Sequence, residues 1–435
     1  MTQTLHTQPL NKVDQKTLDA MVAKHEDFNR AKVGGARANF SFCDLSGLDF
    51  AGRDVAHADF TGACLVGANM LRARLDGATL FATDLRHANL IGASLVKADL
   101  RGSVFKATSM MGANLEGADL RDGKIAEMGR GGELVGGWGS SDNKPVGADF
   151  SNANLTGAKL SGAVASNTNF SNAIMRGCSM VRTNLKGANF TGADLNAANL
   201  MGADLRDAVL RGAILIGADM AMTETAGADF SNVLTDAPVG RSILELDAPV
   251  VELLNSHAAW IKSGGSKGQK VDLSGYDLRP AFPLGEVTFT AIQAVGTVVY
   301  GLRFPGIEMQ YAQFDDGDLR ACDLSRGDLR GISLQRAMLN MTNLAGAKLG
   351  PLELAPGKFK NASLAEAALR HVNFKGADLT NVDFSRADCS YADFSGANLT
   401  GAKFSSAHMT GAILSGAKLD DADLSDLADD TDIVY

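Results

Sequence analysis

Apolar side chains recur every five residues along most of the chain. In the stretch from His87 to Leu100 the large apolar residues are Leu90, Leu95 and Leu100, and an Ala stands two positions before each. An amphipathic helix repeats its apolar face at three and four residues and a half-buried strand at two, so neither predicts this period. A fixed spacing over many units indicates a solenoid, whose units bury their apolar faces by stacking on each other.

The large apolar residue of each unit, here called the centre, keeps its phase through two blocks. The first block runs from Phe40 to Phe230 with one gap after Ile125, and the second runs in another phase from Phe304 to Leu424. We expect the centre and the small residue two before it to point inward, and the other three residues to face water. Because Gly or another turn-forming residue follows most centres, the chain bends after each short extended step, and four steps close a square.

These tandem A(D/N)LxG steps, as in the stretch from Ala377 to Asn381, resemble the repeats of the pentapeptide-repeat family over most of the chain. The resemblance implies an all-β solenoid, the right-handed quadrilateral β-helix. It also implies that centres and small residues stack as ladders inside a narrow tube. We expect two such rods in tandem.

A helical pattern precedes each block. In each, a His is followed three residues later by an aromatic residue, and the four residues are His25, Phe28, His257 and Trp260. The first coil of a solenoid exposes apolar side chains and unpaired strand edges, which a helix laid over that end would cover. We therefore interpret the chain as a tandem duplication in which a short capping α-helix precedes each rod, and these four residues as cap-helix packing residues.

The predicted organisation has five parts. They are an N-terminal segment with a cap helix (1–35), a first β-helix (36–233) with a loop insertion (126–148), a helical linker and cap (234–270), a second β-helix (271–424) and an acidic tail (425–435). The second rod is expected to begin with an irregular coil, because the phase shifts by one between Leu278 and Phe289.

The insertion at 126–148 is Gly-rich but has neither a GK[ST] nor a GxGxxG pattern, so it does not indicate a phosphate site. It is either a tolerated excursion or a projection that binds a partner, since a Trp on a loop is an effective anchor at an interface. The candidate binding residues are Glu133, Leu134, Val135 and Trp138. Because Ile125 and Phe150 share one phase, the rod can continue beneath the insertion.

The net charge of the chain limits the kinds of partner that we expect it to bind. The formal net charge is -9, which argues against direct nucleic-acid binding because that task needs a basic stripe. The resemblance offers one alternative, since pentapeptide-repeat proteins of the quinolone-resistance type mimic DNA and modulate type II topoisomerases such as gyrase. Opposite charges are interspersed, as in Asp99-Leu100-Arg101, and this pattern favours a solvated face over a DNA mimic.

No candidate chemistry stands out from the repeat. We find no Ser-His-Asp arrangement and no metal-ligand spacing, so we expect no enzyme, no catalytic residue, no metal and no cofactor. Four of the five Cys occupy inward positions without a CxxC pair, which is typical of a reducing compartment. No run is long enough to span a membrane, and the first residues lack the apolar stretch of a secretory signal, so we expect a cytoplasmic protein.

The sequence therefore predicts a non-catalytic scaffold that binds other proteins through the flat faces of its rods and the loop. The alternative is the DNA mimic, with a type II topoisomerase as the partner. A homodimer is compatible with the sequence, which carries no signal for one.

Overall fold

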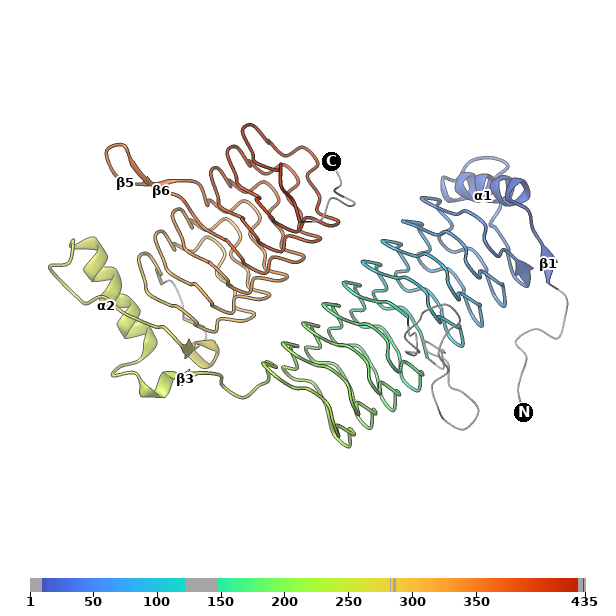
Figure 1. Cartoon of the computed structure of the whole chain (residues 1–435), viewed down its shortest axis with the longest axis horizontal. Helices are drawn as coiled ribbons and strands as arrows, with labels where there is room; N and C mark the ends of the chain where they lie inside the picture. Colours follow the sequence, from blue (N-terminus) through green and yellow to red (C-terminus); the bar gives the residue numbers. More distant parts are fainter. Residues whose placement is uncertain (1–9, 122–147, 282, 285–286, 429–432, 434–435) are drawn as a thin grey trace. The chain divides into compact units, whose positions relative to one another are not determined.

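The computed structural model describes residues 10–121, 148–281, 283–284, 287–428 and 433. The chain forms two compact units, residues 1–237 and 238–435. Each unit has its own hydrophobic core, and both are built from stacked coils of chain with little regular helix or strand (Figure 1).

The coils of each unit are joined by parallel β-bridges between residues twenty positions apart. Asn39 pairs with Asp59 and Asp59 with Thr79, and the same step recurs on all four sides of the coil. At each bridge the residue before a centre bonds to the preceding coil. The Asp59 amide donates to Ala38 O at 3.2 Å, and the Phe40 amide donates to Asp59 O at 2.6 Å. Twenty residues therefore make one turn of a four-sided β-helix.

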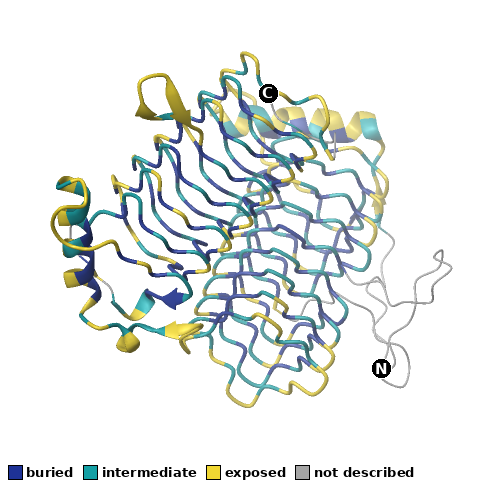
Figure 2. Ribbon diagram, turned by 60° about the vertical axis from the view of Figure 1, so that its left-hand side comes forward, coloured by how far each residue is buried: buried dark blue, intermediate teal, exposed yellow. Residues whose placement is uncertain are grey.

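The interior is filled by the centres and by the small residues two positions before them. Leu195 and Ala193 are both 0 % exposed. A Thr at the small inward position can donate to the carbonyl of a centre in the preceding coil, as Thr183 Oγ1 does to Leu160 O at 2.8 Å, whereas the buried hydroxyl of Thr168 has no such partner. Buried positions recur along the coils of both units (Figure 2), as the five-residue pattern predicts, except in the last coil of each, where the centres Phe230 and Leu424 are only partly buried.

The corner residue, two after each centre, has a left-handed backbone in most repeats, which favours Gly. Gly at this position also leaves space for the side chain of a neighbouring coil. Gly77 has φ 61°, and a Cβ added to it would lie 2.6 Å from Nδ1 of His57, the corner residue twenty positions earlier. The same close approach pairs Gly62 with Phe42. A bulky corner side chain is thus accommodated by a Gly on the next coil.

One expectation from the sequence is wrong, because the residue before each centre does not simply face water. Several acidic residues at this position are at most 4 % exposed, namely Asp84, Asp194, Asp277 and Asp318. This residue carries the bridge, so its side chain lies between equivalent residues of neighbouring coils about 4.8 Å away. At Asp194 the Arg176 guanidinium also donates to the carboxylate.

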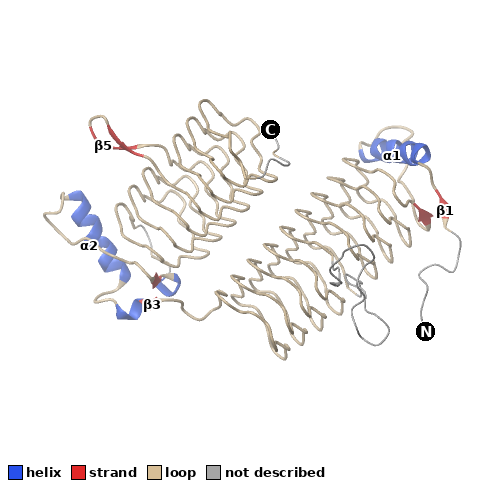
Figure 3. Ribbon diagram, viewed as in Figure 1, coloured by secondary structure: helices blue, strands red, loops and turns tan. Residues whose placement is uncertain are grey.

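The first unit begins with a strand and a helix that precede the coils (Figure 3). Strand β1 (Asn11–Lys12) pairs in parallel with β2 (Cys43–Asp44) in the first coil. Helix α1 (Gln15–Asn29) starts at Asp14, whose carboxylate accepts a hydrogen bond from the Thr17 amide at 2.8 Å. Buried residues of α1, including Leu18 and Val22, belong to the core of the unit.

The second unit repeats this arrangement. Strand β3 (Arg241–Ser242) pairs in parallel with β4 (Tyr276–Asp277), and the short helix η1 (Ile243–Glu245) and helix α2 (Val250–Lys262) lie between them in sequence. A further short helix, η2 (Arg279–Ala281), follows β4.

The spacing between bridged residues departs from twenty at three places. In the second unit Asp272 pairs with Gln293, so the first coil has one extra residue, as the phase shift predicts. In the first unit Ser109 pairs with Asp149, so the stack continues across the gap at 122–147. Farther along the second unit, the residues that pair across the stack are thirty positions apart.

The ten extra residues form a hairpin that the sequence pattern does not reveal. Its strands, β5 (Leu352–Ala355) and β6 (Lys358–Lys360), pair antiparallel and project from the coils (Figure 1). Leu354 and Phe359 stand in the phase of the centres, yet they are 54 % and 61 % exposed. Because ten is a multiple of five, the inserted residues leave the phase of the repeat unchanged. The phase alone therefore predicts two more repeats where the hairpin lies.

Candidate interaction surface

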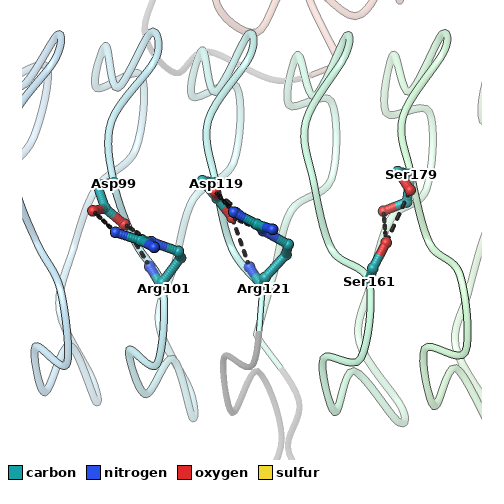
Figure 4. A network of polar contacts seen from close by, with 6 residues as sticks. All are labelled: Asp99, Arg101, Asp119, Arg121, Ser161 and Ser179. Atoms are coloured by element: carbon teal, nitrogen blue, oxygen red, sulfur yellow. Dashed lines mark hydrogen bonds and ion pairs between the residues drawn. The ribbon is translucent and has the colours of Figure 1, made fainter.

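Acidic residues on the outer sides of the coils are paired with Arg residues two positions later. Asp99 and Arg101 lie 2.8 Å apart, and Asp119 and Arg121 lie 2.7 Å apart on the next coil (Figure 4). The guanidinium of Arg101 lowers the pKa of the Asp99 carboxyl. Five further pairs have this spacing, namely Asp84 with Arg86, Asp204 with Arg206, Asp277 with Arg279, Asp318 with Arg320, and Asp328 with Arg330.

Along the same side of the first unit the charged pairs give way to hydroxyls. Ser161 Oγ lies 2.9 Å from Ser179 Oγ at the position that the Arg–Asp pairs occupy on the preceding coils (Figure 4). On another side, amides replace carboxylates, and Asn69 Nδ2 donates to Asp49 Oδ1 at 3.0 Å. These sides therefore present neutralised or uncharged polar groups, and the carboxylates named here are not a free row of negative charge.

The two histidines identified from the sequence are buried between their helix and the first coil of their unit. His25 Nε2 lies 2.8 Å from Ala56 O, and its Nδ1 accepts from the Ala38 amide at 3.0 Å. In the second unit His257 Nε2 lies 2.8 Å from Thr290 O, and its Nδ1 accepts from the Val271 amide at 3.1 Å. Because an amide occupies Nδ1, the proton is assigned to Nε2, which donates to the carbonyl.

The aromatic residues three positions later lie against these histidines. The ring of Phe28 stacks on His25 with centroids 6.2 Å apart, and the ring of Trp260 stacks on His257 at 5.8 Å. Phe28 is 46 % exposed, so it covers the imidazole from the solvent side and is not part of the core.

The other predicted site residues have no described position. Glu133, Leu134, Val135 and Trp138 lie outside the described residues, and their role in binding remains a prediction.

Three observations bear on chemistry within the described part of the chain. It contains no group of three or more His, Cys, Asp or Glu side chains that could hold a metal ion, and no helix there is long and apolar enough to cross a membrane. His371 stacks on the Tyr391 ring at 5.2 Å, and burial lowers the pKa of its imidazole to about 4. Its Nε2 has no hydrogen-bond partner, so the ring is packed as an apolar group.

The second unit carries a hollow surface that the sequence did not indicate. One hollow of about 370 Å³ lies between α2, the first coils and the base of the hairpin, and a second of about 640 Å³ adjoins it. Both are lined by Ala258 and Lys262 of α2 and by Thr288 and Glu308 of the coils. The two hollows therefore form one continuous depression, here called the trough.

The base of the hairpin forms part of the trough. Leu352, the first residue of β5, lines the trough together with Tyr311, and Leu352 and Lys360 pack over Gly331 at the corner of the coil. In Figure 3 the hairpin and α2 extend from the same side of the second unit. The sequence signals that could have located it are Pro351 and the turn-forming pair Pro356-Gly357, which have no place in a regular repeat.

Comparison with known protein families finds pentapeptide repeats in eight copies that cover more than half of the chain. The copies lie at residues 36–70, 56–80, 83–122, 148–187, 188–221, 312–350, 358–388 and 387–426. The chain belongs to the pentapeptide-repeat family. Members of this family are generally structural or interaction proteins without enzymatic activity. No curated protein matches this pentapeptide-repeat protein.

Three solved structures are among those similar to this pentapeptide-repeat protein. HetL, involved in heterocyst differentiation regulation in Nostoc sp. strain PCC 7120, is 19 % identical over 92 % of this chain and 95 % of its own, with a TM-score of 0.14. Rfr23 from Cyanothece 51142 is 31 % identical over 29 % and 91 %, with a TM-score of 0.14. QnrB1, a plasmid-mediated fluoroquinolone resistance protein, is 16 % identical over 46 % and 90 %, with a TM-score of 0.21. Superpositions with such low scores say nothing of the function of this chain.

Proposed function

We propose that this pentapeptide-repeat protein is a non-catalytic scaffold that binds other proteins. The hairpin β5–β6 is the observation that carries the proposal. It projects from a regular stack of coils, and its Leu354 and Phe359 are 54 % and 61 % exposed. Burial of these two side chains against a partner would remove apolar surface from water. The loop at 126–148 is a second proposed contact.

We also propose that the chain consists of two tandem right-handed quadrilateral β-helices, each closed at its first coil by a capping helix. Three contacts support the cap in the first unit. Strand β1 pairs with the first coil, the Gln15 side-chain amide exchanges two 2.9 Å hydrogen bonds with the backbone of Asp49, and His25 bonds to Ala56 O. Each satisfies backbone groups that the first coil would otherwise leave unpaired.

The DNA-mimic alternative rests on the net charge of -9. A mimic of duplex DNA needs rows of carboxylates free to meet the basic surface of a topoisomerase. The Asp–Arg pairs weigh against it, because the carboxylates of these pairs are neutralised within their own coil. A gyrase supercoiling assay tests this alternative, since a mimic should inhibit supercoiling at stoichiometric amounts.

A hairpin deletion tests the proposed function. Removing residues 351–360 joins Leu349-Gly350 to Asn361-Ala362-Ser363-Leu364, which is a regular repeat and restores the twenty-residue spacing. We expect an unchanged circular dichroism spectrum and melting temperature, because the coils on both sides already stack on each other. Proteins recovered with the intact chain from its host should be lost with the deletion.

A double substitution, Leu354→Ser with Phe359→Ser, serves as the matched control that keeps the hairpin backbone. Loss of the same proteins with this variant assigns binding to the two apolar side chains. If both variants retain every recovered protein, the hairpin is not the binding element and the proposal fails for this surface.

A further inference from the structure

The trough of the second unit has the chemistry of a peptide-binding site. We propose that it binds an extended segment of a partner protein that carries carboxylate side chains next to one or two apolar ones. The proposal rests on the protein-binding function proposed above and names the chemistry of the partner.

The trough is built from three parts of the second unit that are far apart in sequence. Helix α2 supplies one wall through Ala258, Ile261 and Lys262, and the base of the hairpin supplies another through Leu352. The floor is the side of the first coils, where Thr290 Oγ1 donates to Gln310 Oε1 at 2.6 Å. This hydrogen bond joins two successive coils.

The charge of the trough is opposite to that of the whole protein. Lys262, Arg303 and Arg330 line it, and Glu308 is the one carboxylate among its lining residues. Arg330 is held by Asp328 at 2.7 Å. Neither Lys262 nor Arg303 has a carboxylate at ion-pair distance within the described part of the chain, in contrast to the paired Arg residues of the coils. In a chain of net charge -9 such exposed, unpaired cations favour an acidic ligand.

The apolar residues of the trough indicate a peptide as the ligand. Ile261 of α2 and Leu352 of the hairpin both line the trough, together with Tyr311, a corner residue of the coils that is 40 % exposed. Such pockets accept side chains of an extended peptide, while the cations at the rim meet its carboxylates. A nucleic-acid strand is a weaker fit, because it calls for a run of basic residues and several stacking aromatics. The trough is lined by two aromatic residues, of which Phe304 is only 9 % exposed and Tyr311 is 40 % exposed.

The test uses the full-length protein and a fluorescein-labelled ten-residue peptide with four Glu and two Leu residues, measured by fluorescence anisotropy. A second peptide with Lys in place of every Glu is the counter-probe. We expect the acidic peptide to bind at least about tenfold more tightly than the basic one, and its binding to weaken as NaCl rises from 0.05 to 0.5 M.

Charge reversal locates the site. Lys262→Glu with Arg303→Glu should weaken binding of the acidic peptide at least about tenfold. Lys403→Glu, which reverses one exposed lysine on a distant coil of the same unit, should leave it unchanged. Circular dichroism and the melting temperature confirm that both variants fold.

Three results would overturn the proposal. The first is equal binding of the two peptides, and the second is undiminished binding by the double variant. The third is tighter binding of a ten-nucleotide oligothymidylate that the same substitutions abolish, which would assign the trough to nucleic acid. If the peptide result is negative while the hairpin deletion still loses its partners, only the trough assignment fails. If neither surface binds, the scaffold function fails as well.

Discussion

Replacing His257 by Phe should destabilise the second unit and leave the first unit intact. The imidazole is 0 % exposed and joins α2 to two separate parts of the coil through the Thr290 carbonyl and the Val271 amide. Phe retains a planar ring but forms neither bond, so a buried carbonyl and a buried amide lose their partners. Each unsatisfied group costs about 1–3 kcal/mol, so the two groups give about 2–6 kcal/mol for the variant.

The size of this effect makes it measurable by calorimetry. For a unit of this length, 1 kcal/mol shifts the melting temperature by roughly 2–4 °C, so we expect the melting temperature of the second unit to fall by about 4–24 °C. Hydrogen exchange followed by mass spectrometry assigns each transition, because peptides from residues 238–435 should lose protection first. His25→Phe should produce the mirror result in residues 1–237.

His87→Phe provides the control, since this histidine is exposed at a corner of the first unit and its replacement should change stability by less than about 0.5 kcal/mol. A melting temperature for His257→Phe within 2 °C of the unmodified protein would refute the reasoning. So would loss of protection spread equally over both units, because the two histidines would then not act each on its own unit.

Three further changes probe other features. Gly268→Ala would place a Cβ 2.0 Å from Ser256 O and should cost about 1–3 kcal/mol more than Gly264→Ala, which has a similar backbone and open space around it, as measured by urea denaturation. Ala193→Leu, at a position that is 0 % exposed, should cost about 1–3 kcal/mol by overpacking. Because burial lowers the pKa of His371 to about 4 from 6.5, unfolding takes up a proton in this range, so stability should fall as the pH drops from 6.5 to 4, and His371→Asn should remove that part of the pH dependence of the melting temperature.

Each of these expectations has an outcome against it. Equal midpoints for the two Gly variants would mean that the loop after α2 moves freely away from the helix backbone. An unchanged midpoint for Ala193→Leu would place that side chain outside the tube. A pH profile that is the same with Asn at position 371 would show that the imidazole is solvated in the folded protein.

The five-residue period predicted the interior well because it records a steric rule. Every inward side chain packs against the equivalent side chain of the next coil. Burial of a residue such as Leu195 can therefore be predicted from its place in the repeat. The two buried helix histidines were also recognisable, since His25 and His257 stand 13 and 14 residues before the amides that donate to them, Ala38 and Val271. Both features could be predicted because each depends on residues that lie close together in the sequence.

The outer surface could not be predicted in the same way. The pattern assigned Asp194 to solvent, although Arg176, eighteen residues earlier, covers it, and Asp194→Ser should therefore destabilise the coil. The hairpin escaped notice because an insertion of ten residues preserves the phase. The trough is formed by α2, the side of the coils and Leu352, which are far apart in sequence. Their proximity depends on the number of residues in each turn, so the trough could not be predicted from the repeat pattern.

The Asp–Arg pairs of the coils have a consequence for how such a chain can evolve. Aspartate and arginine of one pair, as in Asp204-Leu205-Arg206, are encoded within a single five-residue step. Unequal recombination between repeats that gains or loses one whole turn therefore moves both partners together, and no carboxylate of this kind is left without its cation. Pairs that join successive turns, such as Arg336 with Asp316, are broken by the same event at its boundaries. Charge balance confined to one step lets the length of the rod change in a lineage without a compensating mutation.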